Sequence, residues 1–357
     1  MLRSARKETA IAPLRPSRSV LAGILGTVLV LVAAEVVVRL WLVSPSIAVP
    51  DKRYSWITPP YARIVHSAEG WSTTRTNSMG LLDDELRVPR TGVRAVLLGD
   101  SFTEALQVAR RDNFGSVAER QMPGLEVVSV GYSGRSPVEY ADWLEEYGPR
   151  LAPDIVIVQL NDGDLADLLM PAAQARLAAA AAPPSGPPPE GRLARLSRLV
   201  LRNSSLVTVA WRRMKQLATD ERAQLARRLH GAGVSAAGPA STVLAVDPRL
   251  PSLMDMLHRR IAAHAPKLIY LYIPTIDYFG PRFSYGDPQA AAFYHAFAAR
   301  NRVTLVDPFD RFRAEFARTG QPLHGFPNSV MGRGHINAVG HRVLGEQLAR
   351  AIAEATR

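Results

Sequence analysis

The chain contains no cysteine among its 357 residues. This excludes a disulfide framework, a thiol nucleophile and the cysteine-linked lipid anchor of a lipoprotein. Aromatic residues are also scarce, at 7%, and they are not interleaved with Lys and Arg in the pattern that single-stranded nucleic acid requires. The net charge of +11 is therefore not a nucleic-acid signal, and we expect no nucleic-acid partner.

The excess of basic residues is concentrated in two segments. Five of them precede an apolar run near the N-terminus, and ten lie between Arg192 and Arg228, where Asp220 and Glu221 are the only acids. Positive charge on one side of a membrane-crossing segment favours retention of that side in the cytoplasm. Residues 1–18 are therefore predicted to be a basic cytoplasmic tail.

Residues 19–43 form an apolar run long enough to cross a hydrocarbon core of ~30 Å as a helix. The run contains Glu35 and Arg39, whose i, i+4 spacing allows mutual neutralisation, close to an end where side chains can reach the interface beside Trp41. A cleaved signal peptide is the alternative, but the run exceeds a typical signal core and lacks a clear small-residue cleavage site. We predict an uncleaved signal anchor that leaves the rest of the chain outside the cytoplasmic membrane.

Residues 93–170 alternate between strand and helix patterns. Three short apolar runs predict buried strands, over Val93–Leu98, Leu125–Val130 and Asp154–Leu160. Helical spacing is found between them, over Ala105–Gln121 and Glu139–Tyr147. Such alternation predicts a parallel sheet with helices on both faces, and ligands bind such sheets at the carboxyl ends of the strands.

The same pattern resumes over residues 243–357. Strands are predicted over Leu268–Ile273 and Val303–Val306, and helices over Pro251–Ala263, Pro288–Arg300, Pro308–Arg318 and Asn337–Ala355. Five parallel strands with helices between them predict an α/β protein with a flavodoxin-like, three-layer α/β/α arrangement.

Two further segments surround the first half of this domain. Residues 44–92 read as an irregular juxtamembrane lead-in with one or two strands, including a turn at Gly80 within Arg75–Leu86. Residues 171–242 read as an insertion. It comprises an Ala- and Pro-rich linker (171–191), one or two basic amphipathic helices (192–229) and a return linker (231–242). The helices fit a lid or packed helix, a membrane-surface element, or a partner-docking element.

Four short blocks give the chain a family resemblance. GDSFTEA places Ser101 directly after the first strand; Gly134 lies in VVSVGYSGRS, Asn161 in DIVIVQLNDGD and His335 in GHINAVGH. In this order the blocks resemble those of the SGNH (GDSL-like) hydrolases. The resemblance covers roughly residues 75–170 and 243–357.

The resemblance implies a role for each block residue. Ser101 would be the nucleophile and His335 its base, without a metal or cofactor. The oxyanion hole would comprise the amides of Ser101 and Gly134 and the side-chain NH₂ of Asn161. Asp100, Asp162 and Asn337 would support these residues. Taken singly, a Ser capping a helix, a Gly in a turn and an Asn at a strand end are equally ordinary.

The chain also departs from the family pattern. An Asp normally precedes the His by two or three residues, but Arg333 and Gly332 occupy those positions here. Another acid (Asp307 or Asp310) could orient the ring, a backbone carbonyl could hold it, the protein could use a Ser–His dyad, or activity could be impaired. The second block has Ser129 and Gly131 around the usual Asn position, and Gln159 replaces a common Gly. His324 and His341 lie off the motif and are expected to be structural.

Together these features predict a membrane-anchored, extracytoplasmic serine esterase. The resemblance implies O-acyl esters, chiefly O-acetyl esters, of carbohydrate or cell-envelope substrates. An O-acetyltransferase of the same fold and a non-catalytic scaffold are the alternatives. The catalytic hypothesis requires hydrogen-bond contact between Ser101 and His335, with Asn161 beside them.

Overall fold

A computed structural model describes residues 17–44, 49–51, 55–179, 191–211, 213–214 and 247–357. Its centre is a five-stranded parallel sheet with the spatial order β11-β8-β7-β5-β6. The strands are β5 (Val93–Gly99), β6 (Leu125–Gly131), β7 (Ile155–Asn161), β8 (Leu268–Ile273) and β11 (Thr304–Val306). In chain order this is the 2-1-3-4-5 arrangement, so the flavodoxin-like prediction is confirmed.

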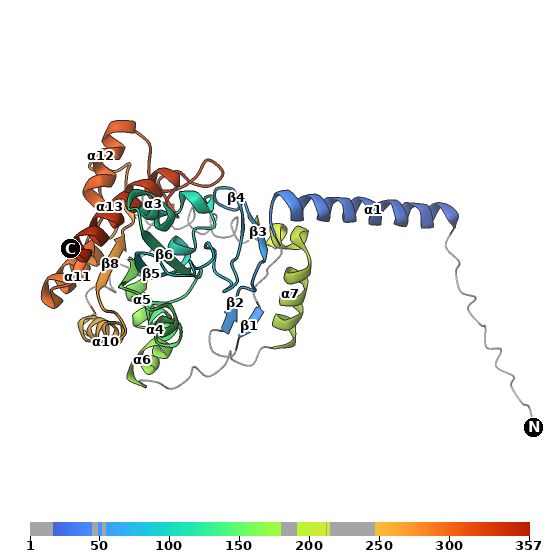
Figure 1. Cartoon of the computed structure of the whole chain (residues 1–357). Helices are drawn as coiled ribbons and strands as arrows, with labels where there is room; N and C mark the ends of the chain where they lie inside the picture. The colour runs from blue at the N-terminus through green and yellow to red at the C-terminus, as the bar shows by residue number, and fades with distance from the viewer. Residues whose placement is uncertain (1–16, 45–48, 52–54, 180–190, 212, 215–246) are drawn as a thin grey trace, which may run out of the picture.

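Helices cover both faces of this sheet (Figure 1). One face carries α4 (Pro137–Leu151), α10 (Leu250–Ala262) and α11 (Pro288–Asn301), and the other carries α3 (Phe114–Gln121), α12 (Phe309–Thr319) and α13 (Ala338–Thr356). The central strand β5 supplies both cores, because successive side chains of a strand point to opposite faces. Val96 and Leu98 belong to one cluster, and Ala95 and Leu97 to the other.

The helix predicted over Ala105–Gln121 is wrong in its first half. A single turn, α2 (Ser101–Glu104), ends at Ala105, which has a positive φ of 51°. A 3₁₀ turn (Arg110–Asp112) follows before α3 begins. Asn113 explains the restart: its side chain accepts from the Gly115 amide as the cap of α3 and donates to the Thr103 carbonyl.

The lead-in is more ordered than predicted. Its described residues form four short strands in two antiparallel pairs: β1 (Val49–Asp51) with β2 (Ser55–Ile57), and β3 (Arg63–His66) with β4 (Ser72–Arg75). The β3–β4 hairpin lies beside the end of the N-terminal helix α1 (Arg18–Trp41). Gly80 occupies the predicted turn with φ +76°, its amide donating to the Asn77 carbonyl.

The segment predicted as a linker over 171–191 begins with a helix, α6 (Pro171–Ala178). Pro171 is in the first turn of this helix, where proline is favoured, and alanine is the best helix former. Ala173 and Leu177 are buried in the core on the face of the sheet that carries α4, α10 and α11. A short α5 (Asp164–Leu168) precedes it. Of the predicted basic helices, α7 (Arg192–Asn203) is present, and residues 205–211 are also helical. Residues 180–190 and the return linker 231–242 lie outside the described residues.

The helix α1 has 24 residues and a mean hydropathy of 2.5 in its most apolar stretch. By length and composition it is compatible with a membrane span or a signal sequence. The predicted ion pair between Glu35 and Arg39 forms, with an N–O distance of 2.9 Å.

Candidate active site

Ser101 and His335 meet at the carboxyl edge of the sheet. The Ser101 Oγ lies 2.8 Å from His335 Nε2, within hydrogen-bond distance. Ser101 follows β5. From β5 the chain continues to β6 on one side of it, and then crosses to β7 on the other side. The strand order of the sheet reverses at this point, and ligands of such sheets bind there, outside the carboxyl ends of the strands. Phe102 packs against the His335 ring, with 4.9 Å between ring centroids.

The acid beside His335 is Glu69, a residue of the lead-in. Its Oε2 lies 2.5 Å from His335 Nδ1, and its Oε1 accepts a hydrogen bond of 3.0 Å from the His335 backbone amide. Both side chains are only partly exposed, at 19% for Glu69 and 25% for His335. A carboxylate on Nδ1 leaves Nε2 free to accept the serine proton. The predicted alternatives Asp307 and Asp310 do not occupy this place.

Two features hold Glu69 against the histidine. Asn328 clamps its loop by accepting from the Gly70 amide (2.8 Å) and donating to the carbonyls of Ser67 (2.9 Å) and Gly70 (2.8 Å). Gly334 has φ +77°, and a Cβ built there would overlap Glu69 Oε1. The glycine beside the histidine thus gives the carboxylate its room. Arg333, at a position where the family places its acid, is exposed.

The proposed oxyanion donors follow the three adjacent strands β6, β5 and β7. Asn161 ends β7; its Nδ2 donates to Asp100 Oδ2 (2.9 Å) and its Oδ1 accepts from the Gly163 amide (2.7 Å). These bonds orient the amide, and an NH₂ group carries a second proton beyond the one given to Asp100. Gly134, after β6, has φ +77° and open space where a Cβ would be.

Buried polar side chains fix the turns that carry these groups. Gln159, in place of the common glycine, is buried, and its Oε1 accepts from the Asp100 amide (3.1 Å) and the Thr103 hydroxyl (3.2 Å). Glu104 accepts from the amide (3.0 Å) and hydroxyl of Ser133, next to Gly134. Burial raises the pKa of both Glu104 and Asp100.

The remaining predicted residues have structural contacts. Asp162 accepts from the Tyr272 hydroxyl and the Thr275 amide (2.9 Å), and burial raises its pKa. Asn337 caps α13 through the amides of Val339 (3.1 Å) and Gly340 (3.2 Å). Asp162 thereby joins the end of β7 to residues in and after β8, and Asn337 fixes the start of α13 two residues after His335.

The rival acids and histidines are engaged elsewhere. Asp307 lies 2.7 Å from His295 and accepts from Tyr285, while Asp310 pairs with Arg313. His324 contacts the Tyr278 hydroxyl (2.7 Å), and His341 accepts from the Phe114 amide (3.2 Å). Both of these histidines are buried, and burial lowers the pKa of each to about 3. They therefore remain neutral, consistent with the predicted structural role.

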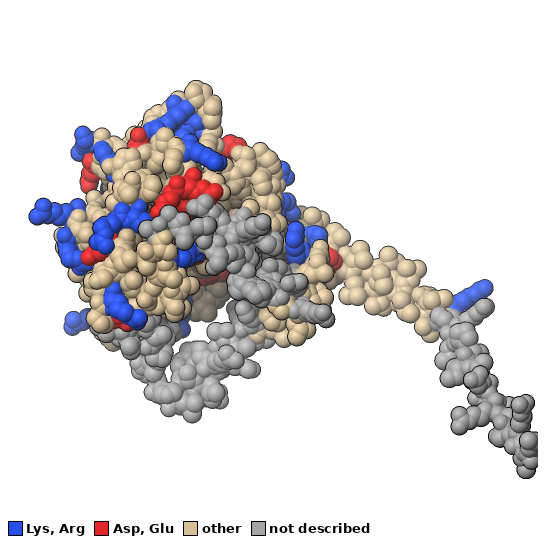
Figure 2. All heavy atoms as spheres, turned by 90° about the horizontal axis from the view of Figure 1, so that it is seen from below, with Lys and Arg blue, Asp and Glu red and all other residues tan. Residues whose placement is uncertain are grey.

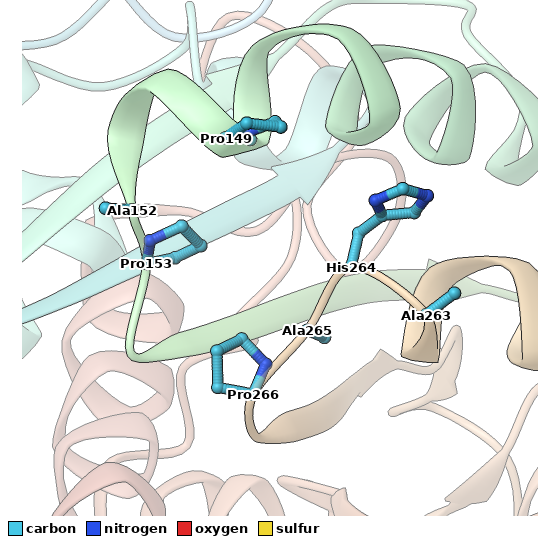
Figure 3. A pocket seen from close by; sticks show the side chains of 8 residues that line it. Pro149, Ala152, Pro153, Ala263, His264, Ala265 and Pro266 are labelled. Atoms are coloured by element: carbon cyan, nitrogen blue, oxygen red, sulfur yellow. The ribbon is translucent and has the colours of Figure 1, made fainter.

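A hollow of about 570 Å³ lies at the opposite edge of the sheet, between residues 148–153 and 263–266 (Figure 3). Alanine and proline line most of it, and His264 is the one ionisable side chain among the lining residues. It adjoins the amino ends of β7 and β8, so it cannot serve Ser101. Among the described residues, no group of three or more His, Asp or Glu is arranged to hold a metal.

Comparison with known proteins decides the family. A model of the GDSL-like Lipase/Acylhydrolase family matches residues 97–343, more than half of the chain. This chain belongs to that family. The GDSL-like match includes Ser101, Gly134, Asn161 and His335 but not Glu69, which precedes it. The protein therefore has the fold of an esterase-type hydrolase. No curated protein matches the sequence.

Solved structures that resemble the chain have low sequence identity. They include TesA (14% identity, TM-score 0.40, covering 73% of this chain and 98% of that one). A lipase/acylhydrolase from Enterococcus faecalis matches with 13% identity and a TM-score of 0.40, over 74% and 96%. An acetylxylan esterase from Geobacillus stearothermophilus matches with 12% identity and a TM-score of 0.38, over 74% and 96%.

Glu69 was not predicted from the sequence, because the candidate positions for the acid were those just before His335 and the residues Asp307 and Asp310. A weak signal is present: Glu69 and Gly70 fall in the turn between two short strands, β3 and β4. The pairing is long-range, across 266 positions. Spacing within one segment cannot reveal such a contact.

Proposed function

We propose that this protein is a membrane-anchored serine esterase whose catalytic domain lies outside the cytoplasmic membrane. Its substrates would be O-acyl esters, chiefly O-acetyl esters, of carbohydrate or cell-envelope molecules. The observation that carries the proposal is the chain of contacts from Ser101 through His335 to Glu69. The acetylxylan esterases among the structural neighbours agree with an O-acetyl substrate but do not carry the argument.

The first half-reaction forms an acyl-enzyme. His335 Nε2 takes the proton from Ser101 Oγ as the oxygen attacks the ester carbonyl. Glu69 on Nδ1 stabilises the imidazolium that forms. The amides of Ser101 and Gly134 and the free proton of the Asn161 NH₂ would bind the oxyanion. Collapse of the tetrahedral intermediate breaks the ester C–O bond, and His335 returns its proton to the leaving alcohol.

The second half-reaction releases the acyl group. Water enters, His335 removes its proton, and the resulting oxygen attacks the acyl-Ser101 carbonyl. Collapse returns the proton to Ser101 and frees the carboxylic acid. A sugar hydroxyl in the place of water would give acetyl transfer with the same residues.

Glu69 also bears on the alternative of a non-catalytic scaffold. The lack of an acid two or three residues before His335 is the feature that favours a scaffold. Glu69, however, contacts the ring Nδ1, where such an acid would lie. A scaffold requires neither this carboxylate nor the glycine that makes room for it.

The test uses the full-length protein in detergent or nanodiscs, with and without Ser101→Ala. Hydrolysis of p-nitrophenyl acetate and covalent labelling by a fluorophosphonate are measured on both. We expect both signals in the wild type and neither in the variant. Labelling without turnover would indicate a transferase that lacks its acceptor. A folded wild type that shows neither signal would contradict the proposal.

A further inference from the structure

The α7 segment (residues 192–211) presents an apolar face that is exposed in the part of the chain that the structure describes. Leu193, Leu196, Leu199 and Val200 of α7 are exposed at 83%, 58%, 59% and 40%. After the break at Ser204, the helical residues 205–211 also expose apolar side chains, Val207 (40% exposed) and Trp211 (49% exposed). The recurrence of these residues every three or four positions marks one side of each helix, which in a water-soluble domain would face the core.

The break in this segment is attached to α1 by the Glu35–Arg39 ion pair. Glu35 accepts hydrogen bonds from the backbone amides of Ser205 (2.7 Å) and Leu206 (3.0 Å) and from the Ser204 hydroxyl (3.0 Å). Arg39 donates to the Asn203 carbonyl at the end of α7 (2.7 Å). The pair therefore satisfies the free amides that begin one helix and a free carbonyl that ends the other. Two charges in an apolar helix thereby acquire a specific role.

The attachment point lies where the membrane boundary is expected. A hydrocarbon core of ~30 Å requires about 20 helical residues, which from Arg18 reaches the Glu35–Arg39 stretch. In Figure 1, α7 runs across the axis of α1 at this end. A helix beside the end of a membrane span and across its axis has the orientation of one that lies in the plane of the interface.

Charge on the segment fits an anionic surface. Four of the 12 residues of α7 are arginine and none is acidic. Arg202 is exposed and lies about 160° around the helix from Val200. Figure 2 shows Lys and Arg side chains gathered where the rod of α1 leaves the body. A helix with exposed apolar residues, several arginines and no acid has the composition of helices that bind anionic headgroups.

A second part of the structure points to the same boundary. Trp41 and Trp71 are exposed at 64% and 58%, and Trp71 Nε1 donates to the Trp41 carbonyl at the end of α1 (3.0 Å). Arg63 donates to the Leu40 carbonyl beside it (3.0 Å). Tryptophans concentrate at membrane interfaces. The two contacts attach the β3–β4 hairpin to α1, and Glu69 lies two residues before Trp71.

We propose that the α7 segment lies in the interface of the bilayer crossed by α1, with anionic phospholipid as its partner. Its apolar face enters the boundary of the acyl chains, and Arg202 lies among the headgroups. The β3–β4 hairpin then holds Glu69, and with it the mouth of the site, beside the membrane surface. This inference rests on the membrane anchor of the proposed function and assigns the segment a partner.

The natural absence of cysteine makes the test direct, because a single introduced cysteine carries the only label. Full-length variants Leu196→Cys and Trp211→Cys are spin-labelled and placed in nanodiscs of phosphatidylcholine and phosphatidylglycerol (3:1). Collision with oxygen, which is enriched in lipid, and with aqueous nickel chelate is measured. Arg202→Cys, the exposed arginine near the end of α7, and the exposed Ala314→Cys on α12 are the matched controls.

We expect labels at 196 and 211 to collide mainly with oxygen, and labels at 202 and 314 mainly with nickel. The preference at 196 and 211 should weaken in pure phosphatidylcholine; an unchanged preference would overturn the assignment of anionic lipid. Free access of nickel to 196 and 211 would overturn the proposal. Protection of these two positions from both reagents would indicate a protein partner or a lid, and would also overturn it.

Val28→Cys, in the middle of α1, tests the membrane anchor separately from the placement of the α7 segment. A label at 28 that is reached by nickel would show that the membrane anchor itself is wrong. A label at 28 that is buried in lipid, with water-exposed labels at 196 and 211, would contradict only the inference about the α7 segment. Esterase activity of the same samples reports on the catalytic proposal separately.

Discussion

Glu69 and His335 are 266 residues apart in the chain and share two hydrogen bonds. One joins the carboxylate to the ring Nδ1 and the other joins it to the backbone amide, so the glutamate fixes both the ring and the loop that carries it. The acid enters from the lead-in between the N-terminal helix and the α/β domain. The lead-in thus supplies a side chain that contacts His335 directly.

Replacement of Gly334 by alanine tests the space that Glu69 requires. A Cβ at this position would overlap Glu69 Oε1, so Gly334→Ala should displace the carboxylate and lower kcat by about 10²-fold or more, toward the loss seen when an orienting acid is removed. The measurement is kcat on p-nitrophenyl acetate together with Tm. Gly320→Ala is the matched control, because Gly320 also has a positive φ (67°) but nothing within 4 Å of its Cβ position. Equal activity losses in the two variants would show that backbone strain alone is responsible.

Asn161→Ala tests the oxyanion role. Loss of one donor typically lowers kcat by about 10²–10³-fold, with little change in KM, because the bond forms in the transition state. Steady-state kinetics measure both constants. Asn301→Ala, which removes a half-buried amide on α11 bonded to Asp255, should leave kcat within about twofold. A change confined to KM in Asn161→Ala would place the amide in substrate binding instead.

His341 predicts a pH dependence of stability. Burial lowers its pKa to about 3, against ~6.5 in the unfolded chain, so the unfolded state binds the proton more readily as pH falls. Protonation of this group therefore does not change the free energy of unfolding above about pH 6.5, and lowers it progressively as the pH falls from 6.5 toward 3. At pH 5 the loss is about 2 kcal/mol, from ~1.36 kcal/mol for each of 1.5 pH units.

Urea unfolding of the wild type and His341→Asn at pH 7.5 and 5 measures this effect. The variant should be less stable at pH 7.5 but should lose less stability on acidification. Subtracting the two curves cancels the pH-dependent contributions of other groups to stability. Asp83 is one such group, because burial raises its pKa to about 7. Parallel stability curves for the two proteins would contradict the neutral, buried state of His341.

Much of the fold could be predicted because it depends on local patterns. Short apolar runs placed all five strands within one or two residues, and their alternation with helices implied the parallel order. Ser101 and His335 could be placed because each lies in a recognisable block. The helix over 105–121 was wrong because apolar spacing does not reveal that Asn113 begins a new helix. The helix Pro171–Ala178 was not predicted because its buried side consists of only two residues, Ala173 and Leu177.

The acid of the site could not be predicted for a different reason. Glu69 reaches His335 through a hairpin turn, a clamp by Asn328 and the space left by Gly334, and none of these contacts is local in sequence. Likewise, Glu35 and Arg39 were expected to neutralise each other, which they do. Their additional bonds to residues 203–206 span 164 to 171 positions and depend on the folded insertion.

The kcat/KM of Glu69→Gln measures whether Glu69 completes the catalytic group. The amide keeps the shape of the side chain but cannot stabilise imidazolium, so we expect a loss of about 10³–10⁴-fold with Tm nearly unchanged. Asp307→Asn, which alters the rival acid paired with His295, should keep activity within about twofold. Near-normal activity in Glu69→Gln, or a large loss in Asp307→Asn alone, would contradict the account.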